Sequence, residues 1–150
     1  MSIAEIFFLV LTTVVYALLE IQIEGKDGWA AKLPTKKITL GRPWSSFIGS
    51  AHRPLTFYHL YLWSFLLVLL HYPLIYVRWS FALELKLLGN FILIATVADW
   101  LWFIFNPNFG LKRFTARNIY WFKSWFLGLP GFYFVNLSLI VVFYWLSFTL

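Results

Sequence analysis

The sequence predicts an all-α fold: a polytopic integral membrane protein whose four transmembrane helices form a single bundle domain, with both termini outside the cytoplasm. The composition, four long apolar runs and the uneven placement of basic residues lead to this prediction. Of the 150 residues, 61% are hydrophobic and 12% are charged, whereas a soluble domain has roughly 25% charged residues. A soluble core of this size does not hide so much apolar surface, so lipid is the expected solvent of the chain.

The first two helices are expected over residues 3–23 and 55–77. At about 1.5 Å per residue, each run is long enough to cross about 30 Å of hydrocarbon. No basic residue precedes the first run, and it is longer than the apolar core of a secretory signal, so we interpret it as a retained membrane helix. Pro73 falls near the end of the second helix, where a kink is tolerated.

The remaining two helices are expected over residues 82–105 and 126–149. Asn106-Pro107 ends the third helix, because Asn and Pro favour turns. A long connection over residues 24–54 joins the first and second helices.

Basic residues predict the orientation of the helices. Of the 12 Lys and Arg residues, all but Arg78 and Lys86 lie in two connections: Lys26, Lys32, Lys36, Lys37, Arg42 and Arg53 in the first, and Lys112, Arg113, Arg117 and Lys123 in the third. Cytoplasmic connections are enriched in Lys and Arg, so we expect a multi-pass protein of the plasma (inner) membrane with both connections in the cytoplasm. The net charge of +6 then indicates attraction to anionic membrane lipids and no nucleic-acid partner.

Ionisable side chains from three helices are predicted to meet near the cytoplasmic face. Glu20 and Glu24 are four residues apart and share one face of the first helix. By helical rise, Glu20, His59 and Asp99 lie about 5, 6 and 9 Å below the cytoplasmic ends of their helices. Glu24, at the helix end, is expected to be solvated or loosely paired with Lys26. Acids inside a membrane usually face a protein interior and have a partner, so the sequence predicts a polar pocket.

The walls of this pocket follow from helical spacing. One face of the third helix carries most of its polar groups and is expected to point inward: Ala95, Thr96, Asp99, Trp102, Phe103 and Asn106. Trp63 and Trp102 are the expected aromatic contacts. We expect the Asp99 carboxylate to contact His59 or Glu20. The alternative is a purely structural pair, of Asp99 with His59 or with Arg53, that locks the helices together.

Two chemistries fit these residues. As metal ligands, Glu20, His59 and Asp99 suit a divalent Fe, Mn or Zn ion, with His52 as a further candidate ligand. As catalytic groups, Glu20, Glu24, His59 and Asp99 suit proton exchange, with His59 as the relay. The chain has no cysteine, which excludes thiolate nucleophiles, Fe–S clusters and Cys-based zinc sites. It also has no compact metal-binding, phosphate-loop or Ser-His-Asp motif.

Three classes of function remain open at this stage. The leading hypothesis is a metal- or proton-dependent enzyme that acts on a lipid- or prenyl-like substrate, with Arg42, Arg53 and Lys36 receiving an anionic headgroup. The second is a non-catalytic subunit that binds a pigment, a quinone or a partner helix in a larger membrane complex. The third is a proton-coupled transporter that works as a homo-oligomer. The sequence does not choose between an enzyme and these alternatives, and it does not identify the substrate.

Overall fold

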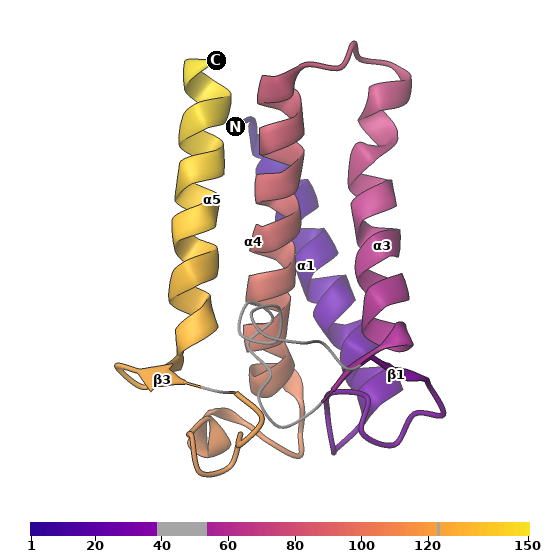
Figure 1. The fold of residues 1–150 in the computed structure, drawn as a ribbon, viewed down its shortest axis with the longest axis vertical. Helices are drawn as coiled ribbons and strands as arrows, with labels where there is room; N and C mark the ends of the chain where they lie inside the picture. Colours follow the sequence, from indigo (N-terminus) through magenta and orange to yellow (C-terminus); the bar gives the residue numbers. More distant parts are fainter. Residues whose placement is uncertain (39–53, 123) are drawn as a thin grey trace.

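The computed structural model of the chain is mostly helical and describes residues 1–38, 54–122 and 124–150. Its four long helices run side by side (Figure 1): α1 (Ile3–Glu24), α3 (Phe57–His71), α4 (Phe81–Phe105) and α5 (Gly131–Thr149). Each is long and apolar enough to cross a membrane, α3 together with the 3₁₀ turn η1 (Tyr72–Ile75) that continues it. The prediction of a mostly helical protein is therefore confirmed, and so is the prediction of four helices long and apolar enough to cross a membrane.

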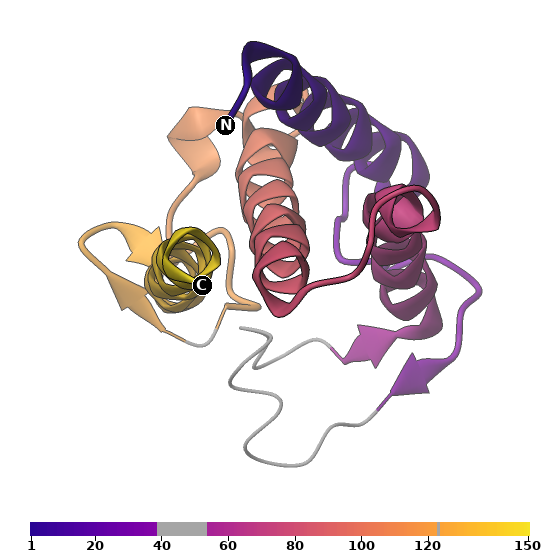
Figure 2. The same cartoon turned by 90° about the horizontal axis from the view of Figure 1, so that it is seen from above.

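Helix α4 is the centre of the arrangement and packs against the other three helices. Seen along the helices, α3 and α5 lie on opposite sides of α4, and α1 covers a third side (Figure 2). Both termini lie at one end of the bundle (Figure 1). We call the opposite end, where α1 and α4 finish and α3 and α5 begin, the hairpin end.

Two short antiparallel strand pairs lie at the hairpin end. Strand β1 (Lys37–Ile38) pairs with β2 (Leu55–Thr56), directly before α3. Strand β3 (Trp125–Phe126) pairs with β4 (Leu129–Pro130), directly before α5. The 3₁₀ turn η2 (Leu111–Arg113) lies in the segment between α4 and β3. These pairs fix how the chain enters α3 and α5.

The beginning of the fourth long helix differs from the sequence prediction. Helix α5 begins at Gly131 and not at residue 126, because the preceding residues form the β3–β4 hairpin. Leu127 and Gly128 make the turn of this hairpin with φ values of 48° and 80°. Two successive residues with positive φ are typical of the tight turns that join antiparallel strands.

The second helix also ends earlier than predicted. Regular α-helix stops at His71, and Pro73 lies in the 3₁₀ turn that follows. Proline has no backbone N–H to donate and its ring crowds the preceding turn, which explains the change of geometry.

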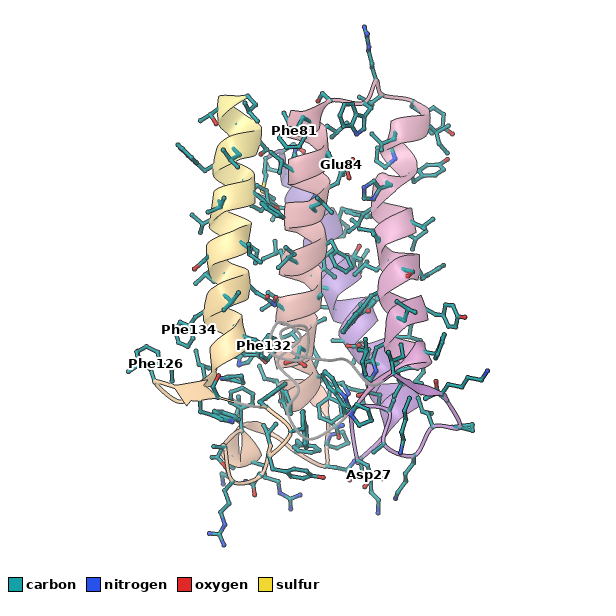
Figure 3. The ribbon with its side chains drawn as sticks, in the orientation of Figure 1. Asp27, Phe81, Glu84, Phe126, Phe132 and Phe134 are labelled. Carbon is teal, nitrogen blue, oxygen red and sulfur yellow. The ribbon has the colours of Figure 1, made fainter. Side chains whose placement is uncertain are left out.

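Polar contacts join α4 to each neighbouring helix. Lys86 pairs with Glu5 of α1 at 2.7 Å. Glu84 accepts a 3.1 Å hydrogen bond from His71 of α3, and Figure 3 shows Glu84 near the start of α4. Between α4 and α5, Asn136 donates to Thr96 at 2.9 Å, and Tyr144 donates to Asn90. Each of these contacts joins one specific pair of positions, so together they fix the register in which the helices pack.

Residues at the end of α4 connect it to the end of α1. The buried Asn106 side chain donates from Nδ2 to the Gly25 carbonyl at 3.0 Å and accepts from the Asn108 N–H at 3.0 Å. An aromatic cluster closes the hairpin end below this contact, with a buried centre formed by Ile21, Trp102, Phe103, Ile119, Trp121 and Phe122. The described residues of the hairpin end therefore form a packed structure.

Gly28 is required where the chain turns back under this cluster. Its φ is +60°, and a Cβ placed there would lie 2.8 Å from Cη2 of Trp102. We expect Gly28→Ala to lower the free energy of unfolding in detergent by about 2–4 kcal/mol, from left-handed backbone strain and steric overlap. Gly128→Ala is the matched control, since Gly128 has a φ of +80° with nothing within 4 Å. We expect Gly128→Ala to lower the free energy of unfolding by about 1–2 kcal/mol. An equal decrease in both variants would contradict a steric role for Trp102 at Gly28.

Candidate functional site

A cavity of about 230 Å³ lies toward the hairpin end, against one face of α4. Glu20, Glu24, His59 and Asp99 all line it, so the structure brings the four predicted site residues from α1, α3 and α4 to one place. The predicted inward face of α4 lines it with Ala95, Thr96, Asp99, Trp102 and Phe103. Trp63 of α3 lines it as well.

Glu24 is held by the chain that follows it. Its two carboxylate oxygens accept the backbone N–H groups of Trp29 and Ala30, each at 2.9 Å. Both of these residues have a φ of 50°, so the chain curls back over the end of α1. Only 7% of the Glu24 side chain is exposed. The expectation of a solvated Glu24 was therefore wrong, because the returning backbone covers the carboxylate.

His59 has a polar neighbour at each ring nitrogen. Nε2 lies 3.4 Å from Oε1 of Glu24, and Nδ1 lies 2.8 Å from the Thr56 hydroxyl. The ring is buried, with Trp29 and Trp63 at centroid distances of 4.6 and 5.7 Å. Thr56 is buried and is not among the described residues that line the cavity, so its hydrogen bond orients the imidazole from behind.

Asp99 has a partner that the sequence did not indicate. Tyr133, at the start of α5, donates a 2.5 Å hydrogen bond to Oδ2 of Asp99. Within the described residues, no hydrogen bond joins Asp99 to His59 or Glu20, which were the expected partners. The acid next to His59 is Glu24. Asp99 and His59 therefore face the same cavity with separate partners.

Glu20 is the acid of the cavity without a hydrogen bond in the described part of the chain. Two buried donors in the cavity wall also have no hydrogen-bond partner among those residues: the Tyr16 hydroxyl and Nε1 of Trp102. Buried polar groups are nearly always hydrogen-bonded. Within the described chain the cavity thus presents the Glu20 carboxylate as a free acceptor, whereas the two donor atoms are enclosed by the protein around them.

The cavity changes from polar to apolar along α4. Its lining runs from Phe103 back to Phe91, which spans about 18 Å of helix. Glu20, Glu24, His59 and Asp99 cluster toward the hairpin end, whereas Phe91 and Ile92 lie farther along α4. Leu139 and Phe132 contribute from α5, and Figure 3 shows Phe132 at the foot of that helix, near α4. The shape and lining suit a molecule with one polar end and an apolar body.

The other predicted binding residues are not part of this lining in the described chain. Lys36 is exposed and does not line the cavity. Arg42, Arg53 and the candidate ligand His52 fall outside the described residues.

The metal hypothesis gains no support from the geometry. Across residues 1–38, 54–122 and 124–150, no group of three His, Asp or Glu side chains is close enough to hold a metal ion. Glu20, His59 and Asp99 share a cavity without forming such a group.

Comparison with known proteins finds no matching family model, no matching curated protein and no matching solved structure. The functional argument therefore depends on the residues of the cavity.

Proposed function

We propose that the chain is a membrane protein with an intramembrane acid–base site that acts on an amphipathic molecule. One observation carries the proposal: three carboxylates and an imidazole line the polar part of a cavity whose other part is apolar. Carboxylates inside a membrane protein usually mark a functional pathway or site, because lipid-facing charge opposes insertion. A bound molecule would place its polar end near Glu20 and its apolar body along α4.

The residues of the site have different roles in this proposal. Glu20 accepts or returns a proton at the polar end of the ligand, because its carboxylate is free of other hydrogen bonds in the described chain. The hydrogen bond from Tyr133 holds the Asp99 carboxylate in place as a second acidic group. Glu24 and His59 form a fixed pair that closes the end of the cavity and can pass a proton between them.

A cavity-filling variant tests whether an amphipathic molecule binds here. Ala95→Trp places a large side chain in the cavity lining, whereas Val97→Trp changes a neighbouring, exposed position of the same helix. We expect lipid extracts of the purified wild-type protein and of Val97→Trp to contain a stoichiometric amount of one amphipathic molecule, identified by mass spectrometry. The extract of folded Ala95→Trp should contain at least about tenfold less, and equal amounts in all three proteins would contradict the proposal.

The orientation in the membrane is a further part of the proposal. The basic connections support a cytoplasmic hairpin end in the plasma membrane, with both termini on the other side. We expect a reporter inserted within residues 32–37 to show a cytoplasmic location. A reporter fused after Leu150 should show a location on the other side of the membrane. The reverse pattern would move the acidic cavity to the outer face of the membrane.

A further inference from the structure

We propose that the β3–β4 hairpin lies in the headgroup layer of the membrane and, with the basic residues that precede it, binds anionic phospholipid. This surface shares no described residue with the lining of the cavity. Three features of the molecule support the assignment: the exposed apolar tip of the hairpin, the level of the tip along α5, and the positive charge of the connection between α4 and α5.

The tip of the hairpin is apolar and exposed. Phe126 is 61% exposed and Leu127 is 80% exposed, and Leu129 on the opposite strand is exposed as well. Turns that face water are usually built from Gly, Asn, Asp, Ser or Pro, and only Gly128 at this turn is of that kind. Contact with lipid removes the apolar side chains from water, which is favourable in proportion to the area covered.

The first turn of α5 sets the level of the tip. The ring centroids of Phe126 and Phe134 are 5.3 Å apart, and Figure 3 shows both residues on the side of α5 away from α4. Phe134 lies three residues into the candidate span that begins at Gly131, which is about 4.5 Å of helix. The hairpin thus folds back along the outside of the span. A water-soluble partner would have to enter the headgroup layer to reach it.

The backbone of the hairpin limits its depth. The two strands pair over two residues each, and the Gly131 N–H donates to the Ser124 carbonyl at 2.8 Å. The turn at Leu127-Gly128 lies beyond these pairs, and its peptide groups need water or headgroups as partners, because unpaired peptide groups are costly in hydrocarbon. The backbone therefore belongs among the headgroups, with the Phe126 and Leu127 side chains at the boundary of the acyl chains.

The connection that carries the hairpin is strongly basic. Residues 106–130 contain four Lys or Arg and no Asp or Glu. Lys112, Arg113 and Arg117 are exposed, and none of them forms an ion pair within the described residues. The orange turn η2, which includes Lys112 and Arg113, lies farther from the helices than β3 at the same end (Figure 1). Cations on the water side of an apolar tip match a lipid with a negatively charged headgroup.

Spin labelling measures where the tip lies. The chain has no cysteine, so a nitroxide on Leu127→Cys reports on that position alone, in the full chain in nanodiscs of phosphatidylglycerol and phosphatidylcholine. Oxygen concentrates among acyl chains, whereas a water-soluble nickel complex is excluded from them. The ratio of oxygen to nickel accessibility should be at least about fivefold higher at Leu127→Cys than at Ala116→Cys, a matched exposed position in the basic segment. Equal ratios would place the tip in water and overturn the proposal.

Co-purified lipid tests the choice of an anionic headgroup. Each protein is extracted from vesicles with equal amounts of phosphatidylglycerol and phosphatidylcholine, and the bound phospholipids are quantified by mass spectrometry. We expect the wild-type protein to retain at least about threefold more phosphatidylglycerol than phosphatidylcholine. Lys112→Gln/Arg117→Gln should lower this ratio by at least about twofold. Arg113 is left in place because it donates to a backbone carbonyl of its own segment.

Lys26→Gln/Lys36→Gln is the matched control, because it removes two exposed charges from the other basic connection. Its lipid ratio should stay within about 1.5-fold of the wild-type ratio, since the hairpin surface is unchanged. A wild-type protein without a preference for phosphatidylglycerol would overturn the proposal. An equal or larger decrease in the control variant would do the same, because net charge and not this surface would then select the lipid.

Discussion

Glu24→Gln is expected to destabilise the protein far more than the same change one helical turn earlier, at Glu20. The Glu24 carboxylate accepts two backbone N–H groups and lies beside His59. In the glutamine variant, one oxygen becomes an NH₂ group that faces the N–H of Trp29 or Ala30, so a buried donor loses its acceptor. We expect the free energy of unfolding to fall by about 3 kcal/mol.

Glu20→Gln is the control for this experiment, because the two residues lie on the same face of α1 and undergo the same chemical change. Glu20 has no hydrogen bond to lose in the described chain, so its variant should change stability by less than about 1 kcal/mol. Unfolding of the purified proteins in mixed micelles, followed by circular dichroism during denaturant titration, gives both values. Similar losses at the two positions would show that the hydrogen bonds of Glu24 contribute little.

Run length and topology were sufficient to predict the helices and to place three ionisable side chains at one level. Four apolar stretches of sufficient length predicted four helices, since a backbone in lipid must satisfy its hydrogen bonds internally. Alternating helix direction then placed Glu20, His59 and Asp99 near one end, and all three line the same cavity. The depth argument succeeded because helical rise is nearly constant.

The hairpin end was less predictable, because its structure depends on contacts between distant residues. The helix was predicted from residue 126 because the stretch is apolar, although Gly128, Pro130 and Gly131 are turn residues that could have indicated the hairpin found there. Asn106 was recognised as a turn residue, but its hydrogen bond to Gly25 joins positions 81 residues apart. No local pattern indicates such a contact.

The partners of the site acids could not be read from the sequence for a related reason. Tyr133 resembles the aromatic residues that line membrane interfaces, so nothing marked it as the donor to Asp99. The positive φ values of Trp29 and Ala30 are unusual for residues with side chains, so the loop that covers Glu24 was not expected. The partners of the acids depend on how α5 and this loop pack. The predicted depth of each acid along its helix does not show that packing.

If the site exchanges protons as proposed, Asp99→Asn is expected to leave the protein folded and to slow this exchange strongly. Asparagine keeps an oxygen that accepts the hydrogen bond from Tyr133, so the contact between α4 and α5 survives. It removes the charge and the exchangeable acid. Thermal unfolding should therefore change little, whereas turnover of the molecule recovered from the cavity should fall by about 100-fold or more, the usual contribution of an acid or base group.

Tyr133→Phe separates the charge of Asp99 from its positioning. This variant keeps the carboxylate but removes its hydrogen bond, so turnover should fall by about tenfold and the pH profile should shift, because the acid has lost a donor. If Asp99→Asn unfolded the protein while Tyr133→Phe did not, Asp99 would be a structural residue whose charge is needed for packing. If Asp99→Asn kept full turnover, the proton would have to move through Glu20 and the Glu24–His59 pair alone. The two variants together therefore decide whether the carboxylate on α4 acts on the ligand or only joins two helices.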